Sequence, residues 1–390
     1  MALPLSRSIR LNYLFYSLAC GATFPYLAPY FKEVVGVSDR YLGVIMMIRP
    51  MMALLGRPLW SQVSDRSGRR SHLGAGLVLT ASAIGLFLIF IHSPGWGCLL
   101  FALWAFFNAP LFTLLDSITY DYLGSRRRDT IGRFRVFASF GFILAVSLVG
   151  FVYDRKGLQS QFAVFSVFGF LTFLTLWPIP RVARCTSRQS RIAIKALLKK
   201  RNVILFLCSV FLIETTNAMA LTFLSIYSKQ LGANNMQIGW IWAWGTCAEV
   251  VTMLLFTQVY RRIGIKNILI VGYVAIVARW ALSGLVTSWW QLLPVQTLHA
   301  LTLTYVYIGS SLFMDMEGSH HIRTSAQSFY TLFILNIAYV LGCVLSGTLS
   351  DHFGYSHMLY TCSAIGFVGL VILVFFVETP EVQNEDTPTT

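Results

Sequence analysis

The sequence is divided into twelve apolar stretches, each about as long as a lipid bilayer is thick. A hydrocarbon core of roughly 30 Å needs about 20 apolar residues for each helical crossing. The stretches run approximately over 11–31, 41–63, 73–92, 96–121, 133–153, 159–178, 203–229, 237–260, 268–287, 289–313, 327–350 and 357–377. They are continuous and do not alternate, which favours helices over barrel strands. We therefore predict an all-α membrane protein with twelve transmembrane helices in a lipid bilayer.

The placement of the basic residues predicts the orientation. The chain is 56% hydrophobic and 12% charged, with a formal net charge of +14. With twelve crossings both termini lie on one side, and the loops and ends on that side carry 21 basic residues against five on the other. Positive loops face the cytoplasm, so we expect both termini to be cytoplasmic in a multi-pass protein of the cell membrane. This distribution explains the positive charge without a nucleic-acid partner.

The chain also predicts an internal duplication. A basic interval, 181–202, separates six stretches from six, and is either a topology-setting linker on the cytoplasmic side or an amphipathic segment on the inner leaflet. SDRSGRR (64–70) aligns with YRRIGIK (260–266), and GFVYDRKG (150–157) with GTLSDHFG (347–354). We expect a six-helix bundle over 1–180, a second over 203–378, and a short acidic tail over 379–390. Parallel repeats of this kind build transporters that hold a substrate near the membrane midplane.

The segment PLWSQVSDRSGRRS (58–71) resembles the loop between helices two and three of the major facilitator superfamily, whose pattern is G-x-x-x-D-R-x-G-R-R. The matching residues are Asp65, Arg66, Gly68, Arg69 and Arg70, and Ser61 replaces the first glycine. Glycine permits a tight turn, and Asp65 can accept charge-assisted hydrogen bonds from an arginine or a helix end. The resemblance implies a conformational-switch loop whose bond forms in only one of two states.

Other segments resemble one branch of that superfamily, typified by a phenylpropionate transporter and related to nucleoside:proton and oligosaccharide:proton symporters. They are NAPLFTLLDS (108–117), IGRFRVFASFGF (131–142), IGWIWAWGTCAEV (238–250), RW (279–280) and QTLH (296–299). The chain departs from the branch after the helix-five arginine, where Phe137 and Ala138 replace an aromatic residue and a glycine.

Three ionisable residues are expected at one depth in the membrane. Glu249, Arg279 and His299 each lie roughly 14–18 Å from the outer end of their stretches, at about 1.5 Å per residue. Desolvation disfavours a charged carboxylate and a neighbouring arginine favours it, so the balance changes as a cavity wets and dries. We predict a proton-coupling site, as the resemblance to oligosaccharide:proton symporters also implies. The alternative is a static Glu249–Arg279 bridge, with His299 bonded to Gln296 or a backbone carbonyl.

The other predicted site residues concern the substrate. The resemblance implies that an acid on helix four and an arginine on helix five hold it, which here means Asp116 with Arg135 or Arg133. Because the two arginines are two residues apart, at most one faces the cavity well. The alternative is an ion pair that anchors the loop.

Further candidates lie in the second half. Glu214 lies in the middle of its stretch beside Asn217, and Arg49 could serve it across the cavity. Both could instead be packing polar groups. Trp244 is one of several aromatic residues that could stack on a substrate, or could contact lipid or neighbouring helices.

We predict a proton-driven symporter of a small organic solute, namely a sugar, nucleoside or aromatic acid, which acts as a monomer. The alternatives are a proton antiporter that exports drugs or sugars, and a membrane nutrient sensor without transport. The sequence has no nucleophile with a paired base, no metal-ligand cluster and no phosphate-binding glycine loop. We therefore expect no enzyme activity, no metal and no cofactor other than the coupling proton.

Overall fold

The computed structural model describes residues 5–91, 93–124, 130–180, 199–317 and 329–380. Within these ranges the regular secondary structure is helical, and no strand occurs. Helices satisfy their own backbone hydrogen bonds, as apolar segments in lipid require. The prediction of an all-α protein is therefore confirmed. The predicted linker, 181–202, and the acidic tail lie mostly outside the described residues.

The first half of the molecule, residues 5–180, begins with a helix that changes its hydrogen-bond pattern near Pro25 and Pro29. Proline lacks an N–H and disturbs a regular helix at such positions. The elements in chain order are α1 (Leu5–Thr23), η1 (Phe24–Tyr26), α2 (Leu27–Pro29), η2 (Tyr30–Val34), α3 (Asp39–Ser67), α4 (Arg70–Leu88), α5 (Pro94–Asn108), α6 (Leu111–Leu123), α7 (Gly132–Lys156) and α8 (Ser160–Leu176).

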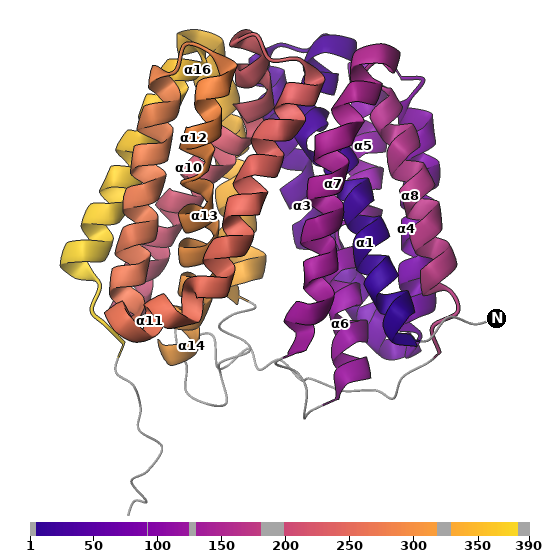
Figure 1. The fold of residues 1–390 in the computed structure, drawn as a ribbon, viewed down its shortest axis with the longest axis horizontal. Helices are drawn as coiled ribbons and strands as arrows, with labels where there is room; N and C mark the ends of the chain where they lie inside the picture. Colours follow the sequence, from indigo (N-terminus) through magenta and orange to yellow (C-terminus); the bar gives the residue numbers. More distant parts are fainter. Residues whose placement is uncertain (1–4, 92, 125–129, 181–198, 318–328, 381–390) are drawn as a thin grey trace, which may run out of the picture.

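The second half, residues 199–380, lies beside the first, and Figure 1 shows it on the left in orange and yellow. Its elements are α10 (Arg201–Gln230), α11 (Asn235–Leu285), η4 (Trp289–Gln291), α12 (Leu292–Gln296), α13 (His299–Leu301), η5 (Thr302–Ile308), α14 (Gly309–Glu317), η6 (Tyr330–Ile334) and α16 (Leu335–Phe376). The segment 289–317 is irregular, because short helical pieces and a π-helical turn, η5, interrupt it.

Backbone conformation supports the predicted duplication. Gly157 has φ 83° and ψ 159°, and Gly354, its predicted counterpart, has φ 78° and ψ 169°. Gly68 and Gly264 also share a positive φ, 63° and 77°, although their ψ angles differ. α11 and α16 each consist of two helices that meet at one of these glycines, because only glycine adopts such angles without strain.

Many large apolar side chains lie on the outside of the molecule. Phe90, Leu254 and Phe375 are each at least 75% exposed. Among the described residues, seven helical stretches are long and apolar enough to cross a membrane: 39–67, 70–88, 94–123, 132–156, 201–230, 235–285 and 330–376. An apolar exterior on helices of this length is that of a multi-pass membrane protein.

The two halves meet backbone to backbone at one end, which we call the closed end. A Cβ atom added to Gly239 of α11 would lie 1.8 Å from the carbonyl oxygen of Val146 on α7. A Cβ atom added to Gly43 of α3 would lie 2.4 Å from the carbonyl oxygen of Cys343 on α16. These close approaches require glycine.

Polar contacts also join the halves at the closed end. The carboxylate of Asp154 accepts hydrogen bonds from the backbone N–H groups of Asn235 and Met236, at 3.0 and 3.2 Å. Lys229 forms an ion pair with Glu33 at 2.6 Å. Since Asn235 begins α11, Asp154 satisfies free N–H groups at the start of that helix.

Candidate functional site

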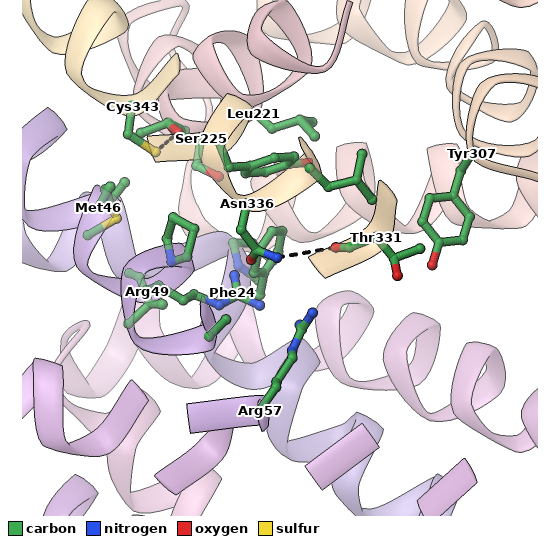
Figure 2. Close-up of a pocket in the computed structure, with 18 residues that line it drawn as sticks. Phe24, Met46, Arg49, Arg57, Leu221, Ser225, Tyr307, Thr331, Asn336 and Cys343 are labelled. Atoms are coloured by element: carbon green, nitrogen blue, oxygen red, sulfur yellow. Dashed lines mark hydrogen bonds between the residues drawn. The ribbon is translucent and has the colours of Figure 1, made fainter. Parts of the chain in front are cut away.

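A chamber lies between the halves and consists of two adjoining cavities of about 370 and 420 Å³. Cavities of this size hold small organic ligands. Residues shared by both cavities come from both halves; they are Phe24, Arg49, Ala53, Arg57, Leu221 and Tyr339. Figure 2 shows the first cavity, into which the Arg57 side chain extends from α3.

One wall of the second cavity carries Glu249 and His299. The Oε2 atom of Glu249 lies 3.9 Å from Nε2 of His299, and both side chains are largely buried, at 16% and 14% exposure. Nδ1 of the same imidazole lies 3.0 Å from Nη1 of Arg279. We call these three residues the ionisable series. It runs from the chamber into the second half, in the order Glu249, His299, Arg279.

Arg279 forms the buried end of this series. It is 1% exposed. Its guanidinium donates to Oγ1 of Thr302 at 3.2 Å and to the side-chain oxygen of Gln296, and lies 4.2 Å from the ring centre of Trp280. Hydrogen bonds and a cation–π contact compensate for the burial of a permanent charge.

The direct Glu249–Arg279 bridge, given above as the alternative to proton coupling, is not formed in the described structure. His299 lies between them, so the series is a chain and not a pair. The irregular backbone of 289–317 places His299 at this point, directly before η5. Gly245 of α11 leaves room for the imidazole, because a Cβ atom there would lie 3.1 Å from Cδ2 of His299. Arg279 has two other hydrogen-bond partners, Gln296 and Thr302. The sequence alone did not identify them as site residues.

Asp116 and Arg135 form an ion pair between α6 and α7. Nη2 of Arg135 lies 2.6 Å from Oδ2 of Asp116, and Nε donates to Oδ1 at 3.1 Å. The hydroxyl of Tyr13 also donates to Oδ1, at 2.6 Å. Arg133 lies exposed two residues away. Neither Asp116 nor Arg135 lines the two cavities of the chamber.

Glu214, Asn217 and Trp244 do not line these cavities either. Glu214 is buried and accepts a hydrogen bond of 3.4 Å from Asn217 on the same helix. Its suggested partner Arg49 instead lies over the ring of Phe24, at 4.4 Å. Trp244 is 51% exposed and donates to Oγ1 of Thr297 at 2.9 Å.

A different tryptophan of the same helix faces the chamber. Trp242, two residues before Trp244, lines the second cavity, and its ring lies 5.3 Å from that of Phe24. The helical periodicity places residues two apart on different faces. The sequence alone does not indicate which face points inward.

The D-R-x-G-R-R segment forms a turn between α3 and α4. Gly68 ends α3 in the left-handed conformation, at φ 63°. Arg70 pairs with Asp65 at 3.0 Å and with Asp121 of α6. The expected bond to Asp65 is therefore made by an arginine of the segment itself. Arg69 is exposed, and its backbone N–H donates to Ser67, while Arg66 precedes the turn in α3.

Arg49 and Arg57 are both chamber residues, although the sequence suggested Arg49 only as a partner of Glu214 across the cavity and gave no role to Arg57. Both line both cavities. Nε of Arg57 donates to the carbonyl oxygen of Ala109 at 3.3 Å. Within the described ranges, neither arginine forms an ion pair with a carboxylate. The signal for both is a basic residue inside the apolar stretch 41–63.

In its described residues the chain has apolar helices long enough to cross a membrane and cavities between its two halves that could hold a small molecule, an arrangement that favours a membrane transporter. The profile of the MFS_1 like family matches residues 7–361, so the chain belongs to this family of the major facilitator superfamily. It is 24% identical over 363 residues to the probable 3-phenylpropionic acid transporter of Escherichia coli, covering 91% of this chain and 94% of that protein. It is 28% identical over 296 residues to the nucleoside permease NupG of Escherichia coli, covering 70% of each chain.

A solved structure shares the fold. The crystal structure of the nucleoside transporter NupG aligns with a TM-score of 0.84 and 17% sequence identity, covering 96% of this chain and 100% of that chain. The family match over residues 7–361 confirms the superfamily predicted from the sequence, and with the named relatives it identifies a membrane transporter.

Proposed function

We propose that the protein is a proton-coupled symporter that imports a small organic solute by alternating access. The observation that carries the proposal is the ionisable series, which connects a chamber-facing carboxyl group, Glu249, through His299 to the buried Arg279. Charged groups within membrane-spanning segments are costly, and they commonly serve ion or proton pathways.

The series provides a place where a proton can be held and released. Glu249 faces the chamber, so water in the open chamber can deliver a proton to its carboxylate. Protonation removes the negative charge near His299 and leaves the positive charge of Arg279 uncompensated by that carboxylate. Loss of the proton restores the attraction. A protonation step therefore changes the electrostatic balance of the chamber wall, which is the change that coupling requires.

The proposed topology has twelve crossings, with both termini and the turn at Gly68 on the cytoplasmic side of the cell membrane. α11 and α16 each contain two of the predicted stretches, which is consistent with this count. The closed end lies at the start of α3 and the D-R-x-G-R-R turn at its other end. With this orientation the closed end faces outward, and the structure represents the state with its chamber directed to the cytoplasm.

The solute belongs to the group of sugars, nucleosides and aromatic acids. The relatives named above carry the names of an aromatic acid and of nucleosides. The chamber offers both polar groups and aromatic rings, including Asn336, Tyr339 and Trp242. Aromatic rings can stack on a phenyl ring, a nucleobase or a sugar face.

Uptake by proteoliposomes tests this proposal. The purified protein is reconstituted, and radiolabelled solutes of the three classes are offered with and without an imposed inward proton gradient. We expect the gradient to drive accumulation of one solute, and addition of this solute to drive proton entry. Accumulation that ignores the gradient, together with no solute-driven proton movement, would contradict coupling.

The direction of the two fluxes separates the alternatives. Proton entry that accompanies solute exit would identify an antiporter. Binding without any flux of solute in exchange assays would identify a sensor.

A further inference from the structure

The chamber contains two arginines from one helix, and its lining in the described ranges includes one acid, Glu249. Arg49 and Arg57 are eight residues apart on α3, which separates them by about 12 Å along the axis and about 80° around it. Their side chains therefore leave the helix on the same side. Each is followed by a proline, Pro50 and Pro58, which bends or loosens the helix at these points.

The known partners of the two guanidinium groups leave most of their donors available. Arg49 lies over the ring of Phe24, and Arg57 donates through Nε to one carbonyl oxygen. A guanidinium has five N–H donors in a planar fork, and this fork matches a carboxylate. In the described part of the first cavity the lining includes both arginines and no acidic residue.

The remaining acid of the chamber is engaged elsewhere. Glu249 lines the second cavity and faces His299. Once Glu249 carries a proton, as the proposed function requires, the described lining of the two cavities holds no other carboxylate that could face the two arginines. Positive charges surrounded by low-dielectric walls attract an anion strongly.

Apolar groups surround the same arginines. Phe24, Leu221 and Leu335 line the first cavity, and Tyr307 and Tyr339 add aromatic surface. Figure 2 shows Arg57 reaching into the space that these elements enclose, with Arg49 beside Phe24. The site therefore combines a cationic centre with an apolar wall. A neutral sugar carries no negative charge to match this cationic centre.

We propose that the transported solute is a small organic carboxylate, whose charged group lies between Arg49 and Arg57 and whose apolar body lies against the neighbouring wall. This inference rests on the proposed transport function and narrows its substrate class. It excludes neutral sugars and neutral nucleosides as the principal solutes.

Equilibrium binding to the purified full-length protein tests the inference. The melting temperature in detergent is measured with matched probes that differ only in charge: benzoate, phenylacetate and hexanoate against their primary amides, with sucrose and uridine as neutral solutes. We expect stabilisation by one or more carboxylates and none by the corresponding amides. Equal stabilisation by an amide, stabilisation by sucrose or uridine alone, or no stabilisation by any carboxylate would overturn the proposal.

Substitutions then test whether Arg49 and Arg57 bind the carboxylate group. Arg49→Gln and Arg57→Gln should each weaken carboxylate binding about tenfold or more, since each removes charge-assisted hydrogen bonds. Arg49→Lys and Arg57→Lys should retain part of the affinity. Arg40→Gln is the matched control, because Arg40 is an exposed arginine of the same helix outside both cavities. Folding is checked by the melting temperature without ligand, and unchanged binding by both folded glutamine variants would overturn the assignment.

The binding assay contains no proton gradient, so the two proposals can fail separately. Carboxylate binding that depends on the arginines, without gradient-driven uptake, would leave the substrate class standing and remove the symport function. Gradient-driven uptake of a neutral solute would do the reverse.

Discussion

His299 lies between an acid, Glu249, and an arginine, Arg279, and this position indicates how the three side chains can interact. Its Nε2 faces Glu249 and its Nδ1 faces Arg279, so the ring can pass an electrostatic change from the chamber wall to the buried cation. Sequence depth alone placed the three residues at one level. It could not give their order, because that depends on the irregular backbone of the segment that carries His299.

Glu249→Gln should abolish accumulation driven by a proton gradient, because an amide cannot bind and release a proton. Exchange of labelled for unlabelled solute needs no net proton flux and should continue. Both rates are measured in the same proteoliposomes. Glu378→Gln serves as the control, since Glu378 is exposed at the end of α16. Full gradient-driven accumulation by Glu249→Gln would show that another group carries the proton.

Arg279→Lys should destabilise the protein by about 1–3 kcal/mol, because an ammonium group cannot reproduce the fork that reaches Gln296, His299 and Thr302. Thermal unfolding in detergent measures the effect. Arg262→Lys changes an exposed arginine and should leave the melting temperature unchanged. If both variants melt at the temperature of the parent protein, the bonds of Arg279 do not contribute to stability.

At the scale of helices, glycine decides how closely α7 approaches α11 and how closely α3 approaches α16. Gly239 and Gly43 allow backbone contact at distances that no side chain would tolerate. Not every helical glycine is needed for packing. Gly76 of α4 has open space around the position of a Cβ atom.

Gly239→Ala should destabilise the closed end by about 1–3 kcal/mol, because its methyl group would overlap the carbonyl oxygen of Val146. Gly76→Ala should be neutral or stabilise the protein by about 0.5–1 kcal/mol through helix propensity. Thermal melts of the two variants give the comparison. A Gly239→Ala protein as stable as Gly76→Ala would mean that α7 and α11 separate without penalty.

The helices show which features the sequence can and cannot predict. Hydropathy predicted the apolar stretches, and the aligned glycines Gly157 and Gly354 adopt the same backbone conformation. The sequence did not predict the π-helical turn η5, which depends on packing against neighbours. For the same reason it could not tell that Trp242, and not Trp244, faces the chamber.

For the candidate residues at the chamber, the sequence predicted the depth in the membrane but not the direction of the side chain. Depth along a helix follows from residue counting, so the level of Glu249, Arg279 and His299 could be predicted. The direction of a side chain around the helix depends on how all the helices pack. The sequence therefore does not indicate that Arg57 faces the chamber. Asp116 and Arg135 were expected at the substrate but pair outside the two cavities.

For the whole molecule, the contacts between the halves at the closed end provide a direct test of alternating access. Glu33 and Lys229 come from different halves and form an ion pair there. If the halves separate at this end in each transport cycle, then a covalent link between these positions must stop the cycle.

In a background without the seven native cysteines, Glu33→Cys together with Lys229→Cys should allow a short bifunctional thiol reagent to block uptake. The matched control is Lys200→Cys with Glu317→Cys, an ion pair within the second half, whose cross-linking should leave uptake unchanged. Uptake is measured before and after the reagent. Full uptake by protein cross-linked between positions 33 and 229 would contradict separation of the halves.

The glycine contacts at the closed end also bear on how fast such a carrier works. Gly43 and Gly239 each pack against a facing backbone, and these contacts involve no charged group. Separating them therefore leaves no buried charge without a partner. The accompanying ion pair of Glu33 lies at a partly exposed rim, where water can replace the partner. The carboxylate of Asp154, in contrast, loses two hydrogen bonds when the start of α11 moves away, so we expect this contact to contribute more to the free-energy cost of opening than the glycines or the rim ion pair.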